Sequence, residues 1–462
     1  LDVVYIATPN HLHKEHALAC IAAGKHIICE KPFTINCAEA EEIFAAAKSA
    51  YSATLTFYRS INKMDLIYGI KDRPRFLKVF LFAVQQLLAI MAATIAVPAI
   101  VGNGLTASAA LFGAGVGTII YLLFTKSSSP VFLGSSFAFI GSMFSAFGGA
   151  ASVSVGYWGL IIGAGMAGIV YIIIAAIVKF CGVSWIDRIM PPVIIGPTVA
   201  IIGLSLSANA IADLMNPTVK GGSPYIAIIC GLLTLAVTML CSTYGKRAGR
   251  LIPFIIGILA GYGAASVFAL LGHILDEPSL IVIDYSAVTS LNFKSLAGYF
   301  SMPKFAVLLG GSEGFKGITG SYLLTIFAAY VPVAFVVFAE HLADHKNLSA
   351  IIGIDLLKEP GLTRTLLGDG VGTFVSTIFG GCPNTTYGES IGCVAITRNA
   401  STVSIWGCAF LCIIVSLISP LVAFLETIPK CVMGGVCVAL YGFIAVSGLQ
   451  MLKKVDLGEN KN

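Results

Sequence analysis

Charged residues are scarce in this sequence. Only 11% of its 462 residues are Asp, Glu, Lys or Arg, whereas a soluble domain usually carries about 25%. Hydrophobic residues make up 57%, and the mean hydropathy is +0.90. This balance excludes a soluble globular protein for most of the chain, because so much apolar surface needs lipid as its solvent. The net charge of +5 is small, and no nucleic-acid partner is expected.

Paired cysteines are also lacking. The 12 cysteines form no C-x-x-C pair and stand mostly as single residues in apolar stretches. We interpret them as small buried hydrophobic residues rather than as disulfides or metal ligands. No metal site and no cofactor are expected. A signal peptide is absent too, and the chain begins at Leu1 rather than Met, so we expect a fragment at its start.

Residues 1–57 differ in character from the rest of the chain. The apolar run LDVVYIATP predicts a buried parallel strand, HKEHALACIAAGKH a helix closed by Gly24, HIICEKP a second strand, and CAEAEEIFAAAKSA a second helix. This order is typical of an α/β unit. The strings DVVYIATPNH (2–11), AGKH (23–26) and EKP (30–32) resemble the nucleotide-binding domain of the glucose-fructose oxidoreductase and inositol dehydrogenase family.

This first resemblance implies an NAD(P)-dependent oxidoreductase with Lys31 at its active site. The Gly-rich phosphate turn that precedes these strings in the family is not present, and neither is the substrate domain. Without that turn no helix N-terminus is available to hold a pyrophosphate. We therefore interpret 1–57 as a short, inert α/β remnant, place a junction at 58–63, and take Met64 as a natural start of the second part.

Apolar segments recur from Met64 to the end of the chain, and we count twelve. They are 76–101, 107–124, 131–149, 157–179, 190–214, 223–245, 251–272, 323–343, 367–381, 384–397, 402–425 and 432–452. Two of them, 131–149 and 384–397, are short and rich in Gly and Ser/Thr, which is not typical of lipid-facing spans. Most Lys and Arg of the loops fall on one side if both ends are cytoplasmic, as the positive-inside rule predicts.

The two unusual segments belong to an internal repeat. GSSFAFIG (134–141) is similar to NTTYGESIG (384–392), and seven segments precede the second half, so the halves have opposite orientations. Inverted repeats with matching Gly-interrupted segments are typical of secondary transporters with the substrate at that pair. The second half has only five segments. We expect two spans to be missing, and we expect the twelve alone not to transport.

Acidic residues single out the second half. Between residues 76 and 272 only Asp187 and Asp213 occur, both at segment ends. Glu340 and Asp344 lie at i and i+4 on one predicted helix face, and Glu389 lies inside the short segment. A charge at mid-membrane costs about 2.5–3.5 kcal/mol, so these residues are functional candidates. For Asp344, a cap or ion pair near the cytoplasmic end is the alternative.

The other candidates follow from the broken segments. Extended backbone around 135–137 and 386–388 would present N–H and C=O groups to a cavity. A flat base with alternating N–H and C=O edges matches such groups plus one carboxylate, and Phe137 or Tyr387 is placed to stack on it. His341 should face away from Glu340, and His345 should lie at the membrane interface.

Several motifs carry a second resemblance. They are QQLLAI (85–90), LGSSFAFI (133–140), AEHLADHKNL (339–348), DLLKEPGL (355–362), PNTTYGE (383–389) and AITR (395–398). With them, residues 64–462 resemble the uracil and xanthine permeases of the nucleobase–cation symporter and nucleobase/ascorbate transporter family. The resemblance implies an all-α polytopic membrane protein with fourteen spans in an inverted seven-span repeat, of which this chain holds spans 1–12. The third and tenth spans are half strand and half helix.

The same resemblance implies the site and the substrate. Glu389 and Glu340 hold the nucleobase, Phe137 and Gly388 add backbone contacts, and Glu340 with Asp344 couples transport to a proton. Glu389, where purine carriers often have Gln, favours uracil over xanthine. Ser390 departs from the usual Asn and leaves the neighbouring contacts open.

The resemblance further implies a uracil:proton symporter of the plasma or inner membrane with a cytoplasmic N-terminus. It works by alternating access and is compatible with a homodimer. A xanthine or purine permease, a sulfate-type anion carrier and an oxidoreductase fragment are the alternatives.

The interpretation of residues 1–57 as an inert remnant is testable. Because the phosphate turn is missing from residues 1–57, the purified chain should not bind NAD or NADP at micromolar concentration, measured by titration calorimetry. Deleting residues 1–63 should leave membrane insertion unchanged. Micromolar dinucleotide binding would show that this interpretation is wrong.

Overall fold

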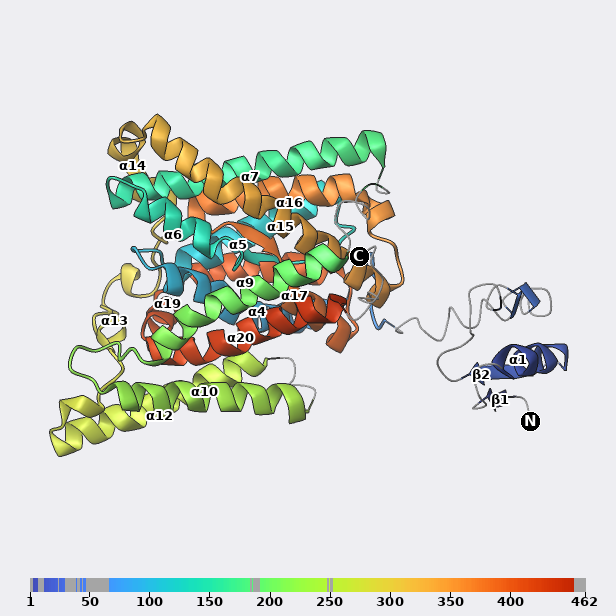
Figure 1. Cartoon of the computed structure of the whole chain (residues 1–462). Helices are drawn as coiled ribbons and strands as arrows, with labels where there is room; N and C mark the ends of the chain where they lie inside the picture. Colours follow the sequence, from blue (N-terminus) through green and yellow to red (C-terminus); the bar gives the residue numbers. More distant parts are fainter. Residues whose placement is uncertain are drawn as a thin grey trace. The chain divides into compact units, whose positions relative to one another are not determined.

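The computed structural model describes residues 3–6, 12–23, 25–29, 39, 42–43, 45–46, 66–182, 185, 192–246, 249 and 252–452. Gly24, Lys31 and the junction 58–63 lie outside these residues. The chain separates into two compact units, Leu1–Asp65 and Leu66–Asn462 (Figure 1). Each unit is described by itself.

The first unit has the strand–helix–strand order that the apolar runs predict. Strand β1 (Val3–Ile6) and strand β2 (His26–Cys29) pair in parallel, with Val3 opposite His26, and helix α1 (His13–Ala22) connects them. A parallel pair needs such a crossover connection, because its two strands run in the same direction. A small buried cluster that includes Ile6 and Ile21 holds these elements together.

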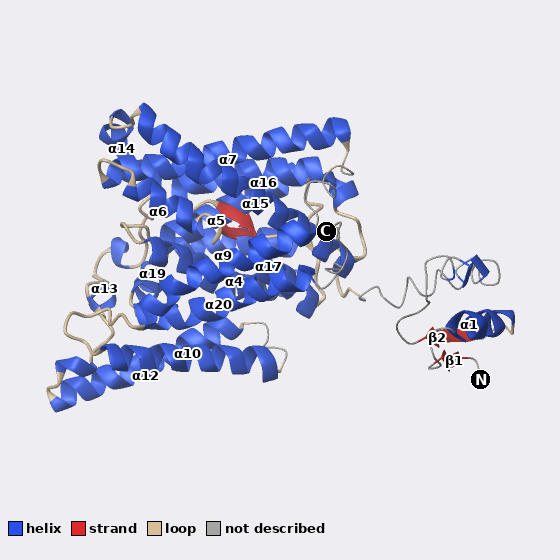
Figure 2. Ribbon diagram, viewed as in Figure 1, coloured by secondary structure: helices blue, strands red, loops and turns tan. Residues whose placement is uncertain are grey.

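The second unit is built almost entirely of helices (Figure 2). Its long helices are α4 (Phe76–Val101), α5 (Ala107–Phe124), α7 (Val153–Cys181), α9 (Pro192–Leu214), α10 (Pro224–Tyr244), α12 (Pro253–Leu275), α15 (Gly320–Ile352), α16 (Leu362–Gly380), α18 (Thr402–Leu417) and α20 (Lys430–Leu452). Shorter elements are strand β3 (Leu133–Ser135) with α6 (Ile140–Gly148), strand β4 (Asn384–Thr386) with α17 (Gly388–Thr397), α13 (Ser286–Thr289), α14 (Ala306–Lys316) and α19 (Ser419–Glu426).

Six of these helices are long and apolar enough to cross a membrane, counted over the described part of the chain. They are α4, α5, α7, α10, α12 and α15, and the bent pair of α19 with α20 forms a further candidate. Long side chains such as Ile173 and Leu270 are more than half exposed on these helices. The unit is therefore a multi-pass membrane body whose outer surface suits lipid.

Each of the twelve predicted segments contains a helix, or a strand followed by a helix, but one bound needs correction. The predicted continuous segment 402–425 is wrong, because α18 ends at Leu417 and α19 is a separate helix bent by 82° from α20. The stretch between the predicted segments 251–272 and 323–343 holds the short helices α13 and α14. The seven-span inverted symmetry itself stays a prediction.

The long helices form two bundles. In the first, here called the core bundle, α16 packs against α5 and α7, α18 against α5 and α4, and α15 against α7. In the second, called the flanking bundle, α20 packs along α9, and α10 packs against α12 and α20. Figure 1 shows α10 and α12 along one edge of the unit, with α7 and α14 along the opposite edge. Contacts between α15 and α9 and between α4 and α20 join the bundles.

The centre of the core bundle is the short antiparallel pair of β3 and β4. Leu133 pairs with Thr386, and Ser135 pairs with Asn384. Side chains of the neighbouring helices supply further partners: the Leu133 N–H donates to Thr118 Oγ1 at 2.9 Å, and Thr373 Oγ1 donates to the Asn384 carbonyl at 2.7 Å. Such partners are required at membrane depth, because no water is present there to satisfy the backbone. The pairing brings two segments 250 residues apart to one place.

Candidate functional site

A cavity of about 350 Å³ lies where the strand pair faces the flanking bundle. Its core-side lining comes from α15, β4, α17 and the residues after β3, and its opposite wall comes from α10, α12 and α20. The lining residues that the sequence predicted as site residues are Phe137, Glu340, Asp344, Tyr387, Gly388 and Glu389. The structure therefore brings all six predicted residues to one cavity. Its size falls within the range of small-molecule sites, about 300–1,000 Å³.

Three carboxylic acids line this cavity. Glu340 and Asp344 lie one turn apart on α15, and Glu389 lies in the first turn of α17. The N-terminal end of a helix carries partial positive charge, which favours a carboxylate at the Glu389 position. Thr386 Oγ1 donates to Asp344 Oδ2 at 2.6 Å, so Asp344 ties α15 to β4. Asp344 therefore belongs to the cavity, rather than acting only as a cap near the cytoplasmic end.

The charge of the cavity restricts its ligand. Among the described residues that line it, three are acidic and none is Lys, Arg or His. An anion would meet repulsion from the ionised carboxylates and would find no positive partner. A ligand that donates N–H groups or delivers a proton suits the same surroundings, because carboxylates are acceptors when ionised.

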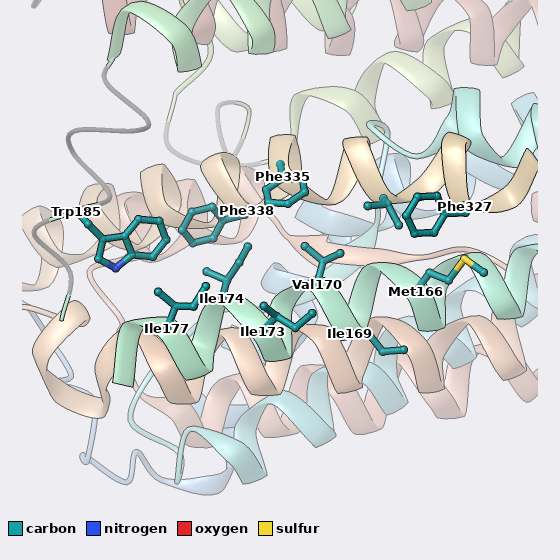
Figure 3. A pocket seen from close by; sticks show the side chains of 11 residues that line it. Met166, Ile169, Val170, Ile173, Ile174, Ile177, Trp185, Phe327, Phe335 and Phe338 are labelled. Carbon is teal, nitrogen blue, oxygen red and sulfur yellow. The ribbon is translucent and has the colours of Figure 1, made fainter. Parts of the chain in front are cut away.

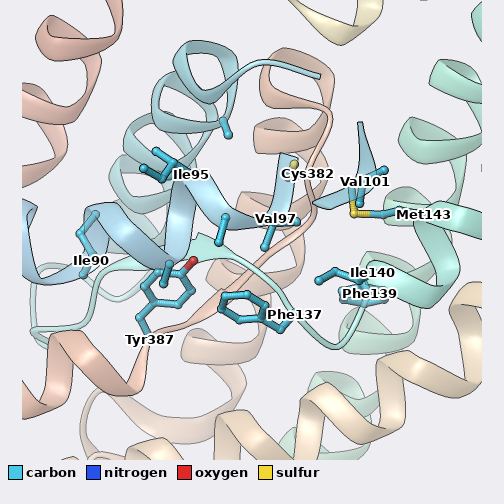
Figure 4. Close-up of a cluster of buried hydrophobic side chains, with 14 of the residues drawn as sticks. Ile90, Ile95, Val97, Val101, Phe137, Phe139, Ile140, Met143, Cys382 and Tyr387 are labelled. Carbon is cyan, nitrogen blue, oxygen red and sulfur yellow. The ribbon is translucent and has the colours of Figure 1, made fainter. Parts of the chain in front are cut away.

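The two predicted aromatic residues differ in how freely their rings can contact a ligand. The Tyr387 hydroxyl donates to the Ser135 carbonyl at 2.8 Å, and the side chain is only 3% exposed. The Phe137 ring lies edge-on to Tyr441 of α20, with 5.7 Å between ring centroids. Figure 4 shows both rings beside the buried apolar cluster around α4. Phe137 thus touches both bundles, whereas Tyr387 is fixed to the strand pair.

Glycine at position 134 allows this placement of Tyr387. A Cβ atom built on Gly134 would lie 2.3 Å from the Tyr387 ring, which is closer than real Cβ contacts allow. Gly388, by contrast, would carry a Cβ into open space and is exposed to the cavity. Its backbone is thus accessible to a ligand.

Ser390 holds the start of α17 in place. Its Oγ accepts from the Phe132 N–H at 3.1 Å and from Gln86 Nε2, while Gln86 Nε2 also donates to the Ser390 carbonyl at 3.2 Å. Gln86 is on α4 and is buried. The contacts that the sequence left open at Ser390 are thus a network that joins α4, the residue before β3, and α17.

Sequence reasoning missed one buried acid. Asp369 of α16 is fully buried, and its Oδ2 lies 2.7 Å from His341 Nδ1. His341 Nε2 lies 3.0 Å from Thr365 Oγ1, so the imidazole is held at both nitrogens. As predicted, His341 faces away from the cavity that Glu340 lines. The cost of a charge at mid-membrane, which singled out Glu340 and Glu389, was the signal that could also have found Asp369.

His345 is fully buried within the protein. Its predicted depth, at the membrane interface, stays a prediction. Its Nδ1 donates to the His341 carbonyl at 2.8 Å, and its Nε2 lies 2.7 Å from the Tyr121 hydroxyl. The prediction placed it near the end of a span closing at residue 343, but α15 continues to Ile352. The longer helix carries His345 into the core bundle.

The wall opposite the acids was not foreseen from the sequence either. It is formed by Phe254 of α12, by Leu440, Phe443 and Ile444 of α20, and by Ser242 of α10. This wall is apolar except for one hydroxyl group. A ligand would therefore meet polar groups on its core-bundle side and an apolar surface on the other, which suits a flat heteroaromatic ring.

A larger cavity of about 550 Å³ lies elsewhere on the unit. Figure 3 shows its lining side chains on α7 and α15, with Trp185 at one end. All eleven are hydrophobic, and none of the predicted site residues is among them. The indole N–H of Trp185 is the one polar side-chain group in this lining, whereas the smaller cavity is lined by three carboxylic acids, so the smaller acidic cavity is the candidate site.

Comparison with known proteins bears on both units. The family model of the xanthine and uracil permeases, described as Permease family, matches residues 77–462. This chain belongs to that permease family. A second family model, described as Oxidoreductase family, NAD-binding Rossmann fold, matches residues 1–57. Both resemblances that the motifs indicated are thus confirmed, and the chain as a whole is a membrane transport protein rather than an enzyme.

Curated relatives agree over most of the chain. The uracil permease of Bacillus subtilis (strain 168) is 36% identical over 411 residues, covering 87% of this chain and 86% of the relative. The uracil permease of Bacillus caldolyticus is 37% identical over 398 residues, covering 86% and 85%. The uracil permease of Escherichia coli (strain K12) is 36% identical over 397 residues, covering 85% and 84%.

Solved structures show the same fold. The transmembrane domain of a cyanobacterium bicarbonate transporter, BicA, aligns with a TM-score of 0.61 at 16% identity, covering 85% of this chain and 93% of that domain. The murine anion transporter Slc26a9 in its inward-facing state aligns with a TM-score of 0.55 at 14% identity, covering 84% and 62%. At these identities the likeness concerns the fold alone.

The buried His341–Asp369 pair yields a test of what holds α15 against α16. Asp369→Asn keeps the shape but removes the charge that accepts from the imidazole, which should cost about 1.5–3 kcal/mol of stability. Thermal unfolding in detergent should show a clearly lower melting temperature. The matched control is Asp355→Asn, at a carboxylate that is 49% exposed and 3.6 Å from Lys358, where about 0–1 kcal/mol is at stake. Equal melting temperatures of the two variants would contradict a structural role of the pair.

Proposed function

We propose that this chain is a nucleobase permease whose substrate is uracil, taken up together with a proton. The observation that carries the proposal is the acidic cavity at the strand pair, with Glu340 and Glu389 on one side and an apolar wall on the other. The named function of the relatives, uracil permease, points to the same substrate.

The chemistry of uracil fits this cavity. The ring is flat and uncharged, and each of its two N–H groups can donate to a carboxylate, while its carbonyl groups can accept from backbone N–H groups such as that of Gly388. Glu389 is the principal acceptor in this proposal, because it lies at the start of α17, and Glu340 is the second. Phe137 contributes its backbone and the edge of its ring, and Tyr387 forms part of the cavity lining beside the strand pair.

The acids also argue against the substrates of the fold neighbours. A bicarbonate transporter and an anion transporter share the fold, but an anion would lie against three carboxylates here. Function depends on the site rather than on the fold. The sulfate-type anion carrier is therefore the weaker alternative, and a xanthine or purine permease is the nearer one, since a purine also offers N–H donors.

Proton coupling rests on the spacing of two of the acids. Glu340 and Asp344 lie one turn apart, so both can be ionised only at the cost of mutual repulsion, and one proton bound to the pair relieves it. Thr386 already donates to Asp344. In the proposal Glu340 faces the substrate and carries the proton, and the charge of Asp344 sets the affinity of Glu340 for that proton.

The two bundles suggest how transport proceeds. The substrate lies between them, so movement of the flanking bundle against the core bundle would open the cavity to either side of the membrane in turn. In the same proposal the protein resides in the plasma or inner membrane, with its N-terminus in the cytoplasm. Residues 1–57 take no part in transport. The exposed helices are compatible with a homodimer.

Substitution of the two glutamates tests the assignment. Glu389→Gln keeps the shape but loses the charge, so uracil binding should weaken by about 10- to 100-fold, the equivalent of a charged hydrogen bond. Glu340→Gln should abolish proton-driven accumulation, and Asp344→Asn should shift the pH optimum more than the affinity. Binding is measured with radiolabelled uracil on the purified protein. Accumulation is measured in cells that express the chain extended by the two further spans that the family resemblance predicts.

The control is Glu313→Gln, at an exposed residue of α14 that pairs with Lys316. It should bind and accumulate uracil like the parent. Wild-type accumulation by Glu340→Gln together with wild-type binding by Glu389→Gln would refute the proposed site. Tighter binding of xanthine than of uracil by the parent would favour the purine alternative.

A further inference from the structure

The segment that precedes α4 contacts a turn that lies far away in the sequence. Residues Leu66–Asp72, here called the strap, run beside the turn that follows α17, with a parallel bridge between Tyr68 and Asn399. The strap precedes α4, and that turn lies more than 300 residues later in the sequence. No local pattern in the sequence of these residues predicts this contact.

The strap meets the turn through a regular set of backbone bonds. The Arg398 carbonyl accepts from the Ile67 N–H at 2.8 Å, and the Ala400 N–H donates to the Tyr68 carbonyl at 2.9 Å. The Thr402 N–H donates to the Ile70 carbonyl at 3.2 Å. The strap carbonyls that accept belong to alternate residues, which is the repeat of a strand.

Side chains of the turn and of α18 also donate to carbonyls of the strap. Thr402 Oγ1 donates to the Ile70 carbonyl at 3.1 Å, and Ser401 Oγ donates to the Asp72 carbonyl at 2.6 Å. At the other end of the strap, Lys78 Nζ donates to the Tyr68 hydroxyl at 3.0 Å. These bonds fix the strap to α4 as well as to the turn.

Apolar packing extends the contact to α17 itself. Ile70 is only 8% exposed and belongs to a buried cluster with Ile391 and Val394 of α17 and with Ala400 of the turn. In the same strap, the side chain of Ile67 is 60% exposed. The strap therefore has one buried isoleucine, Ile70, and one exposed isoleucine, Ile67.

The consequence concerns the position of Glu389. α17 has ten residues and is about 15 Å long, with Glu389 in its first turn and its C-terminal end at Thr397. Arg398, the C-cap, has left-handed backbone geometry, and its carbonyl is among those the strap satisfies. A short helix moves as a unit, so the contacts at its far end restrict where its first turn lies. The network at Ser390 fixes one end, and the strap fixes the other.

We propose that the strap is a positioning element for the substrate site: it holds α17 from its C-terminal end and thereby sets the place of Glu389, without touching the cavity. The proposal rests on the proposed function for the identity of the ligand. Its structural part, the restraint of α17, holds whatever the substrate is.

The test uses the full 462-residue chain purified in detergent. The double variant Ile70→Ala/Thr402→Val removes the buried anchor and one side-chain bond while leaving the backbone intact, and Ile67→Ala is the matched control. Hydrogen exchange of the α17 amides between Ser390 and Val394 should be about tenfold faster in the double variant, as expected for a helix that opens more often. The control should exchange like the parent.

A second measurement links the restraint to binding. The dissociation constant for uracil, measured on the folded fraction, should rise several-fold in the double variant and stay unchanged in Ile67→Ala. A merely structural role would lower the yield or the melting temperature without changing the affinity of the folded protein. If the double variant does not fold, Ser401→Ala, which removes only the bond to the Asp72 carbonyl, should show the same two effects at smaller size.

Two outcomes would overturn the proposal. One is faster exchange confined to residues 397–402, with the amides near Glu389 unchanged. The other is an unchanged uracil affinity in a folded double variant. If the parent itself binds no uracil, the proposed function fails, and hydrogen exchange alone then decides on the strap.

Discussion

The need to satisfy backbone polar groups inside lipid governs this structure more than any other constraint. Two segments leave the helical conformation at membrane depth, and each would otherwise expose N–H and C=O groups that have no water to bind. They pair with one another as β3 and β4, and Thr118 and Thr373 complete the pairing from the sides. Since both segments then continue as helices, the same pairing points the starts of α6 and α17 into the interior. The cavity exists because that backbone is non-helical there.

Buried acids are the second feature that the interior must accommodate, and it does so in two ways. Asp369 is enclosed by His341 and Thr373 and lies away from the cavity. Glu340 and Glu389 instead line the cavity and keep partly exposed side chains. An acid with a permanent partner holds helices together, whereas an acid that faces a cavity is available to a ligand or a proton. The difference separates residues of the scaffold from residues of the site.

Much of this arrangement could be predicted from the sequence. The long apolar runs gave nearly all of the long helices, and the Ser/Gly-rich strings around 135 and 386 indicated where the helices would be interrupted, because both signals are local. The predicted site residues meet at one cavity because β3 pairs with β4 and α15 packs against β4 and α17. Asp369, the burial of His345 and the apolar wall with Phe254 and Phe443 were missed, since each depends on which helices pack together. The strap contact joins residues more than 300 positions apart, and no local pattern encodes it.

The likeness to anion transporters shows how far the fold alone constrains function. The transmembrane domain of a bicarbonate transporter shares this fold at 16% identity. The N-terminus of a helix favours negative charge, and this holds for an anionic ligand as well as for a carboxylate side chain. Here Glu389 occupies such a position, in the first turn of α17. Together with Glu340 and Asp344, this carboxyl group makes the cavity acidic in a fold that two anion transporters share. The side chains that line a site, rather than the fold that carries them, therefore set which charge the site favours.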